Sequence, residues 1–471
     1  MAHLYSEKLS SRKKLLFSIC LALFTLFLAH GLTVVYRAQP LYSYVKGPAR
    51  GWRSPAFRSD PELGWAPIPG ARSAHTFPIG PDIPMRLDAD GFRVPLGERV
   101  RPSATMPFYR TASTPDGLSE LDQGCSCGSI EPLCFKFPMH QGRSRGGATF
   151  SCSRGGGPRR SPERSLGDAV AAEGIHALTG AATRIQIPIQ QGANRRRPLI
   201  LAIGCSFTYG DACLAEDTFP HKVAQALGGT ELNAGVCSYG LAQMLLLAER
   251  LIPRYAPDYV LIQYSPWLVD RAILHFGPTY FSYACNPFFA DASAGGVELC
   301  PPVFSNYEFD IDFSPWRASP RGPLDFASFL LRRALPLCVH NDVTILSYRT
   351  RRALGLVRPP TQNRGAVLKT VYGRIQALCA QNGARPLIVV LGDSVSEITV
   401  PKEISALEMP VANAHAALIA ALSEPKADAY RQAYAHFRGS PPVSVDGHPN
   451  PHAHTLIAGA IVDYIRAKSR P

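Results

Sequence analysis

Two short segments of the chain contain the residue types that together perform nucleophilic acyl chemistry. Ser206 lies in GCSFTYG (204–210), and Asp446 and His448 lie in DGHPN (446–450). A serine hydroxyl is a weak nucleophile until a histidine accepts its proton and a carboxylate orients that histidine. We therefore expect Ser206 to act as nucleophile, His448 as general base and Asp446 as the orienting carboxylate, provided that the fold brings the two segments together.

The segments around Ser206 predict the element that presents it. PLILAIG (198–204) is an apolar run that ends at a glycine, which is typical of a buried parallel strand, and residues 218–227 have helical spacing. Alternating patterns continue to the end, with strands expected at 232–233, 259–264 and 386–391 and helices at 241–254, 365–379, 426–437 and 452–467. The alternation predicts an α/β domain whose parallel sheet is covered on both faces. Ser206 would then lie at the carboxyl end of a strand, where such sheets build their sites.

Three segments of this domain resemble sequence blocks of the SGNH/GDSL hydrolases. GCSFTYGDA (204–212) resembles the first block, NAGVCSYGLAQ (233–243) the second, and the stretch from DGHPN onward (446–465) the last. DPELGW (60–65) and DGFR (90–93) resemble the region before the first block in longer exported members. The resemblance implies a flavodoxin-like three-layer α/β/α sandwich, serine esterase or lipase chemistry, and Ser206, Asp446 and His448 as the triad. It implies no metal and no organic cofactor.

The resemblance also implies an oxyanion hole, and here the sequence departs from the family. The backbone N–H of Ser206 would be one donor. The second-block glycine falls on Ser238, with Gly240 nearby, and the third strand ends in YSPW (264–267), where the family has Gly-x-Asn-Asp. Ser265 is the candidate replacement for that asparagine. Losing one oxyanion donor costs on the order of 10²–10³ in rate in a well-studied protease.

Further departures do not remove a triad member. Cys205 replaces the usual aspartate of the first block, and Asp446 precedes His448 by two residues instead of the commoner three. GDS (392–394) is a literal match to the family signature, but only about 50 residues separate it from Asp446, so we interpret it as a strand-to-loop turn. His452 and His454 are alternative bases, and we favour His448 because it is nearest to Asp446.

The N-terminus carries a membrane signal. Residues 15–36 have no formal charge and, as a helix, span about 30 Å of hydrocarbon. The basic cluster RKK (12–14) precedes them, which predicts a cytoplasmic tail at 1–14, a transmembrane anchor at 15–36 and a periplasmic or extracellular main domain. A cleaved signal peptide is the alternative. The length of the apolar run favours an uncleaved anchor.

The remaining regions complete the predicted domain organisation. Residues 40–100 predict a small extension with short strands, 101–195 a basic, low-complexity and mostly disordered insertion, and 196–471 the hydrolase domain with an irregular insertion at 275–360. The formal net charge of +13 is concentrated in the tail and the basic insertion, so we expect no nucleic-acid partner. Residues 324–337 are amphipathic; we expect a helix packed on the domain, with a helix on a membrane surface as the alternative.

The cysteines show no metal-ligand spacing, and we expect no metal site. Cys205, Cys213 and Cys237 are expected to be buried thiols, whereas Cys285 and Cys300 flank one loop and are a candidate disulfide.

Three functions remain open from the sequence. The favoured one is hydrolysis of O-acyl esters on a small molecule, a lipid or a cell-envelope glycan. An O-acyltransferase would use the same triad with a sugar hydroxyl as acceptor. A non-catalytic glycan-binding or scaffold domain is the third, because the third-block asparagine is missing.

Overall fold

The computed structural model describes residues 11–46, 51–52, 56–77, 80–97, 197–278, 283–310 and 322–469. The predicted insertion at 101–195 and most of the predicted tail lie outside these ranges. The chain divides into two units, residues 1–135 with 196–471, and residues 136–195. All of the structure described below belongs to the first unit.

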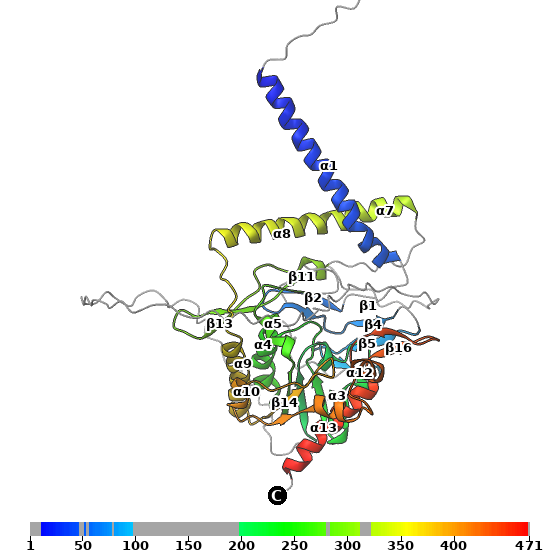
Figure 1. The fold of residues 1–471 in the computed structure, drawn as a ribbon, viewed down its shortest axis with the longest axis vertical. Helices are drawn as coiled ribbons and strands as arrows, with labels where there is room; N and C mark the ends of the chain where they lie inside the picture. Colours follow the sequence, from blue (N-terminus) through cyan, green and yellow to red (C-terminus); the bar gives the residue numbers. More distant parts are fainter. Residues whose placement is uncertain are drawn as a thin grey trace, which may run out of the picture. The chain divides into compact units, whose positions relative to one another are not determined.

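A nine-stranded sheet forms the centre of the domain, in the order β1-β4-β5-β6-β8-β7-β9-β14-β15 (Figure 1). Its second half is parallel throughout and follows the 2-1-3-4-5 order of doubly wound α/β sheets. These strands are β7 (Leu199–Ile203), β8 (Thr230–Asn233), β9 (Tyr259–Tyr264), β14 (Arg385–Val390) and β15 (Val411–Ala412). The strands are buried along most of their length, because helices cover both faces and leave little room for polar side chains.

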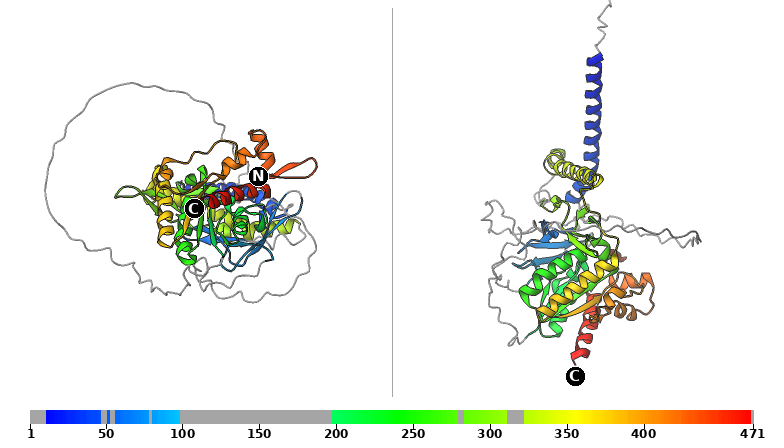
Figure 2. Two further views of the ribbon diagram at one scale, coloured as in Figure 1. Left: turned by 90° about the horizontal axis from the view of Figure 1, so that it is seen from below. Right: turned by 90° about the vertical axis from the view of Figure 1, so that its left-hand side faces the viewer.

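Two helical layers enclose the parallel strands (Figure 2). On one face α3 (Phe219–Ala226) packs on α13 (Pro451–Ser469), which also contacts α11 (Ala414–Ala420). On the other face α4 (Leu241–Tyr255) packs on α9 (Arg364–Gln381). The predicted α/β alternation is therefore confirmed, with boundaries that mostly differ by one or two residues.

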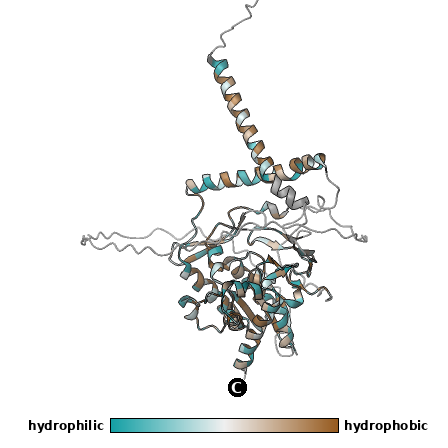
Figure 3. Cartoon of the chain, turned by 45° about the vertical axis from the view of Figure 1, so that its right-hand side comes forward, coloured by the Kyte–Doolittle hydropathy of each residue, from teal (hydrophilic) through white to brown (hydrophobic). Residues whose placement is uncertain are grey.

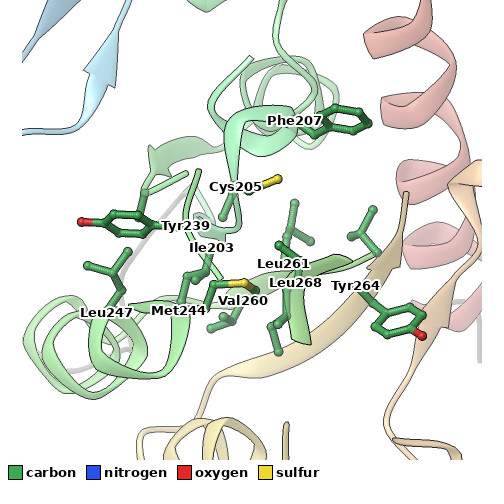
Figure 4. Close-up of a cluster of buried hydrophobic side chains, with 14 of the residues drawn as sticks. Ile203, Cys205, Phe207, Tyr239, Met244, Leu247, Val260, Leu261, Tyr264 and Leu268 are labelled. Atoms are coloured by element: carbon green, nitrogen blue, oxygen red, sulfur yellow. The ribbon is translucent and has the colours of Figure 1, made fainter. Parts of the chain in front are cut away.

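Apolar side chains from strands and helices meet beneath the carboxyl end of β7 (Figure 4). They include Ile203 of β7, Val260 of β9 and Met244 of α4, all fully buried. This core fixes the end of β7, and with it the turn that carries Ser206.

The N-terminal extension is built of short strands, as predicted, but it is not a separate body. β1 (Gly51–Trp52), β4 (Arg72–Thr76), β5 (Ile83–Leu87) and β6 (Arg93–Val94) are antiparallel and continue the main sheet, with Arg93 of β6 paired to Asn233 of β8. The hairpin of β2 (Phe57–Asp60) and β3 (Gly64–Pro67) is tied to the start of α4, because Trp65 packs against Tyr239, whose hydroxyl donates to the Trp65 carbonyl.

The region 275–360 is more regular than predicted. It contains the hairpins β10 (Phe276–Pro278) with β11 (Tyr283–Cys285) and β12 (Phe288–Asp291) with β13 (Val297–Cys300), then the short helix η2 (Tyr307–Asp310). A continuous helical stretch follows, made of α7 (Pro323–Phe329), the π-helical turn η3 (Leu330–Ala334) and α8 (Leu335–Ala353). Prolines and aromatics suggested irregularity, but Pro323 lies in the first turn of α7, where proline is tolerated, and Pro336 directly follows the π-helical turn η3.

The candidate disulfide is a wrong prediction. Cys285 and Cys300 are both free thiols, and the Cys285 sulfur accepts a hydrogen bond from the backbone N–H of Val303 instead. Cys205, Cys213 and Cys237 are free and buried, as expected.

The predicted anchor lies within α1 (Ser11–Lys46), which is exposed along most of its apolar length. Among the described residues this is the one helix long and apolar enough to cross a membrane, over Arg12–Ala38; a signal sequence has the same properties.

We expect Trp65→Ala to lower the free energy of unfolding of the domain by about 3–5 kcal/mol, because it removes a buried indole that joins the extension to α4. Urea unfolding followed by near-ultraviolet circular dichroism measures the change. Leu354→Ala, at an exposed position, is the control and should change it by less than about 0.5 kcal/mol. Equal effects of both substitutions would contradict docking of the extension through Trp65.

Candidate active site

Ser206 begins the short helix α2 (Ser206–Tyr209), and two residues separate it from the end of the buried strand β7. The turn between them requires a glycine, because a Cβ at position 204 would clash with the Thr208 hydroxyl and lie 2.5 Å from Gln263 Oε1. Ser206 is almost fully buried, and its Oγ lies 4.0 Å from Cys205 Sγ. The strand, the glycine and the helix together fix the backbone that presents the serine.

Gln263 of β9 is the polar residue that clamps this turn. Its Oε1 accepts from the Cys205 N–H at 2.9 Å and from the Thr208 hydroxyl at 2.8 Å. Its Nε2 donates to Ser265 Oγ at 2.9 Å and to Cys205 Sγ at 3.2 Å. Sequence reasoning missed this role, although a single amide within the apolar run YVLIQY was the signal that could have revealed it.

Arg93 holds the far side of the same turn from the N-terminal extension. The guanidinium is buried and donates to three backbone carbonyls, those of Tyr209 at 2.8 Å, Gly210 and Cys213. Asn233 of β8 donates to the Thr208 carbonyl at 3.0 Å. The DGFR segment therefore supplies a structural arginine to the site, a role that the sequence did not predict.

Asp446 and His448 lie side by side between β17 (Val443–Asp446) and α13. His448 Nδ1 lies 2.7 Å from Asp446 Oδ1, and the backbone N–H of His448 donates to the same oxygen at 2.8 Å. The Asp446 carboxylate thus accepts hydrogen bonds from both the ring and the backbone of His448. This geometry explains how the short Asp-x-His spacing can orient the imidazole.

Contacts across the site bring this imidazole to the turn that carries Ser206. The His448 ring packs edge-on against Phe207, the neighbour of Ser206, with 5.8 Å between ring centroids. Asp211, whose N–H donates to the Ser206 carbonyl at 3.1 Å, places its Oδ2 4.0 Å from His448 Nε2. Since Ser206 Oγ contacts Cys205 Sγ, proton transfer to Nε2 requires the hydroxyl to exchange that contact for one to the imidazole.

Four groups form a closed ring of alternating charge, which we call the His–Asp ring; two are buried, and the other two, Asp446 and His448, are partly exposed. Asp446 Oδ2 lies 3.4 Å from Nε2 of His75, a residue of β4, and His75 Nδ1 lies 3.1 Å from Asp211 Oδ1. His448, between Asp446 and Asp211, closes the ring. His75 is 3% exposed and Asp211 0%. Neither residue was predicted, because no local motif connects position 75 to the other members.

The His–Asp ring shifts the pKa of each member. Burial disfavours the charged imidazole of His75, but Asp211 and Asp446 outweigh it and raise its pKa to about 10. The same competition, with Asp446 the main opponent of burial, raises the pKa of His448 to about 9. Burial would raise the pKa of both carboxyls, yet the adjacent imidazoles hold the pKa of Asp446 and of Asp211 well below its usual range. With both imidazoles protonated, the ring carries no net charge.

The predicted oxyanion donors occupy different environments. Ser238 has φ of 64°, the left-handed conformation that favours glycine, which agrees with the expectation that this position corresponds to a glycine. The Gly240 N–H donates to Gln243 Oε1 at 3.0 Å, and the buried Ser265 hydroxyl donates to the Leu391 carbonyl at 2.8 Å. The last two donors already have partners within the protein. The backbone N–H groups of Ser206 and Ser238 therefore remain the better predicted donors.

The residues that the sequence offered as alternatives to His448 and Ser206 lie in different surroundings. His454 is buried, its Nδ1 accepts from the Phe219 N–H at 3.2 Å, and burial lowers its pKa to about 3, so it stays neutral within the core. His452 is exposed on α13. Ser394 follows β14, the fourth parallel strand along the chain, and its Oγ accepts from the Ser396 N–H at 3.4 Å.

The described residues contain no group of three or more His, Cys, Asp or Glu side chains arranged to hold a metal ion, even though the His–Asp ring contains two histidines and two aspartates. Its members pair with one another, so their donor atoms do not converge on a common point.

No protein-family model and no curated protein sequence matches the chain. Among solved structures, it is similar to a protein described as lipolytic and of the G-D-S-L family from Desulfitobacterium hafniense DCB-2, with 12% identity over 57% of this chain and 99% of that one, at a TM-score of 0.27. An acylhydrolase from Bacteroides fragilis NCTC 9343 shares 10% identity over 61% and 98% of the two chains, also at 0.27. An acetyl xylan esterase from the rumen bacterium Butyrivibrio proteoclasticus shares 9% over 59% and 65%, again at 0.27. At these TM-scores the similarities assign no function to the chain.

We expect the stability that His75 contributes to depend on pH in a defined direction. Because its pKa rises from 6.5 to about 10 on folding, the contribution is complete below pH 6.5 and is lost as the pH rises through 10. His75→Gln should remove on the order of 3–5 kcal/mol at pH 6 and much less at pH 10. Urea unfolding at pH 6, 8 and 10 measures this difference. His452→Gln, on the exposed side of α13, is the control and should change the free energy of unfolding by less than about 0.5 kcal/mol; an equally small change for His75→Gln at pH 6 would contradict a charged His75.

Proposed function

We propose that the chain is a serine ester hydrolase of the SGNH/GDSL type on a flavodoxin-like three-layer fold. The observation that carries the proposal is the 2.7 Å hydrogen bond between Asp446 and His448, made by an imidazole that packs on the residue next to Ser206. The three groups lie at carboxyl ends of the sheet and in the loop before the last helix, where doubly wound folds hold their reactive residues. The 2-1-3-4-5 strand order supports the same reading of the fold.

The triad implies a two-step reaction. Ser206 Oγ attacks the acyl carbonyl carbon while its proton passes to His448 Nε2, and the protonated imidazole then gives that proton to the leaving alcohol oxygen as the ester bond breaks. Water attacks the acyl-enzyme with His448 again accepting a proton, and the acid and free Ser206 are released. Asp446 holds the imidazole through Nδ1 and stabilises its charged form throughout.

The His–Asp ring extends this triad by two positioning residues. His75 is a buried cation on the oxygen of Asp446 that His448 does not use, so it fixes the carboxylate plane. Asp211 balances that charge and lies near His448 Nε2. Both residues act on the reaction through Asp446 and His448 and not on the acyl group itself.

The proposed substrate is an O-acyl ester on a small molecule, a lipid or a glycan. The basic cluster before the apolar part of α1 supports an anchored topology with the catalytic domain on the periplasmic or extracellular side. The triad chemistry needs neither metal nor organic cofactor.

We expect a fluorophosphonate probe to label the full-length protein at Ser206, because such probes react with serines that an imidazole activates. Ser206→Ala should abolish labelling, and His448→Ala should slow it by about 10³-fold or more. Gel fluorescence and mass spectrometry of the labelled peptide measure the result. Ser394→Ala, which alters the literal GDS segment, is the matched control and should label normally.

Three other outcomes have distinct meanings. Undiminished labelling of Ser206→Ala would refute Ser206 as nucleophile. A folded protein that never labels would favour the non-catalytic glycan-binding alternative. Acyl groups that accumulate on an added glycan, in place of free acid, would favour the O-acyltransferase.

We expect kcat/KM for a soluble ester to rise with pH and to level off near pH 9, since His448 must be neutral to accept a proton and its pKa is raised to about 9. The protonated His75 lowers the pKa of His448 and Asp211 raises it. His75→Gln should therefore move the ascending limb to higher pH, and Asp211→Asn to lower pH. The charges that face His448 and its partners include these two residues, Asp446 and the neighbouring His436, which burial keeps neutral by lowering its pKa. Shifts of the same sign in both variants would rule out this electrostatic account.

A further inference from the structure

The helical stretch α7–η3–α8 has two faces of different character. Its inner face carries Leu337, which is buried, and Tyr348, whose hydroxyl lies 2.8 Å from His275 Nδ1 next to β10. His340 and Arg351 lie on the same side and contact the rings of Tyr307 and Phe304. These contacts seat the inner face on the region between β10 and η2.

The opposite face is apolar and exposed. Leu331 is 64% exposed, Val343 61% and Leu346 67%, and Val339 between them is also exposed. Steps of three, four or eight residues separate these positions, so they follow one side of the helix. Along α8, apolar and polar residues alternate in the hydropathy colouring, in contrast to the nearly continuous apolar run of α1 (Figure 3).

Helix α1 contacts the same stretch at the end of its candidate membrane span. Arg37 Nη1 donates to Asp342 Oδ1 of α8 at 2.7 Å, and His30 Nδ1 lies 3.9 Å from Asp342 Oδ2. Val34 and Ala38 of α1 are buried, and α1 packs on both η3 and α8. Asp342 lies on the helix side of Val339 and Leu346, three or four residues away, so α1 meets the face that carries the exposed apolar residues.

The charge of the stretch favours one kind of partner. Residues 322–353 contain five arginines and two aspartates, one of which, Asp342, is paired with Arg37. Arg332, Arg349 and Arg352 are exposed. Exposed leucines and valines bordered by arginines are the composition of helices that lie in the headgroup region of anionic bilayers.

We propose that α7–η3–α8 lies flat on an anionic phospholipid surface, with Leu331, Val343 and Leu346 inserted among the acyl chains. The occupant of the face is the bilayer that α1 enters, because the contact between Arg37 and Asp342 sets α8 at the level where the apolar run of α1 ends. A helix is about 10–12 Å across, so a helix in this contact lies within one diameter of that level. The inference extends the sequence alternative of a surface helix and does not depend on the catalytic proposal.

The test uses the full-length protein in nanodiscs of phosphatidylcholine with phosphatidylglycerol. A photoreactive diazirine amino acid replaces Leu331, Val343 or Leu346, one at a time, and mass spectrometry identifies the adducts after illumination. The same substitution at Leu23, exposed within the apolar run of α1, is the positive control. Leu96 and Val443, exposed on the catalytic domain to a lesser degree, are the negative controls.

Phospholipid adducts at the three helix positions, at least about five-fold above those at Leu96 and Val443, are the expected result. Lipid adducts at Leu23 alone would overturn the proposal, and so would adducts to a second protein chain at the helix positions. Absence of lipid adducts at every position would overturn both the surface helix and the anchor.

A charge variant tests the lipid selectivity. Arg332→Gln, Arg349→Gln and Arg352→Gln together should lower adduct yield at Leu346 severalfold in the anionic nanodiscs and little in phosphatidylcholine alone. Lys402→Gln, Lys426→Gln and Arg431→Gln remove the same charge from the catalytic domain and should leave the yield unchanged. Equal effects of both triple variants would contradict direct recognition of anionic headgroups by the helix.

Discussion

The pairing of two carboxylates with two imidazoles, of which Asp211 and His75 are buried and Asp446 and His448 are partly exposed, is the interaction on which the rest of the site depends. An unpaired charge in this interior would cost several kcal/mol, so each member is tolerated only because its neighbours are present. Asp446 and His448 come from the end of the chain, Asp211 from the turn after β7, and His75 from the extension. The ring therefore forces three distant segments to converge, and the antiparallel strands that continue the sheet provide the route by which His75 arrives.

Two further side chains, the neutral Gln263 and the charged Arg93, hold the turn that carries Ser206. Gln263 makes four hydrogen bonds, three to the Ser206 turn and one to Ser265. Arg93 donates to the carbonyls of Tyr209, Gly210 and Cys213 at the far side of that turn. Removing Gln263 would take the acceptor from the Cys205 N–H and the Thr208 hydroxyl, and removing Arg93 would take a donor from three backbone carbonyls. A serine held on so many fixed contacts has little freedom except in its own hydroxyl, which is the one movement that the proposed reaction requires.

The sequence predicted what depends on local pattern and missed what depends on long-range pairing. Apolar runs and helical spacing located β7, α4, β9 and α13, and the short Asp-x-His segment indicated the neighbours Asp446 and His448. No local sequence motif marks His75 or Asp211, because an isolated histidine in a strand or an aspartate in a turn usually has only a structural role. Ser265 was predicted as an oxyanion donor from its position at the end of β9, but its position could not show that its hydroxyl donates a hydrogen bond to the Leu391 carbonyl. The candidate disulfide was wrong because Cys285 and Cys300 lie on different hairpins, and their proximity in sequence does not determine the distance between their sulfur atoms.

The placement of His75 has a consequence for how the protein is made. Synthesis delivers residue 75 early and Asp446 only near the end, so the ring joins positions that are separated by most of the length of the chain. Until Asp446 is synthesised, His75 can pair with Asp211 but not with Asp446. Most of the chain must therefore be made before the ring can close. Loss of the final thirty or so residues would remove Asp446 and His448 and leave His75 with Asp211 as the remaining member of its ring.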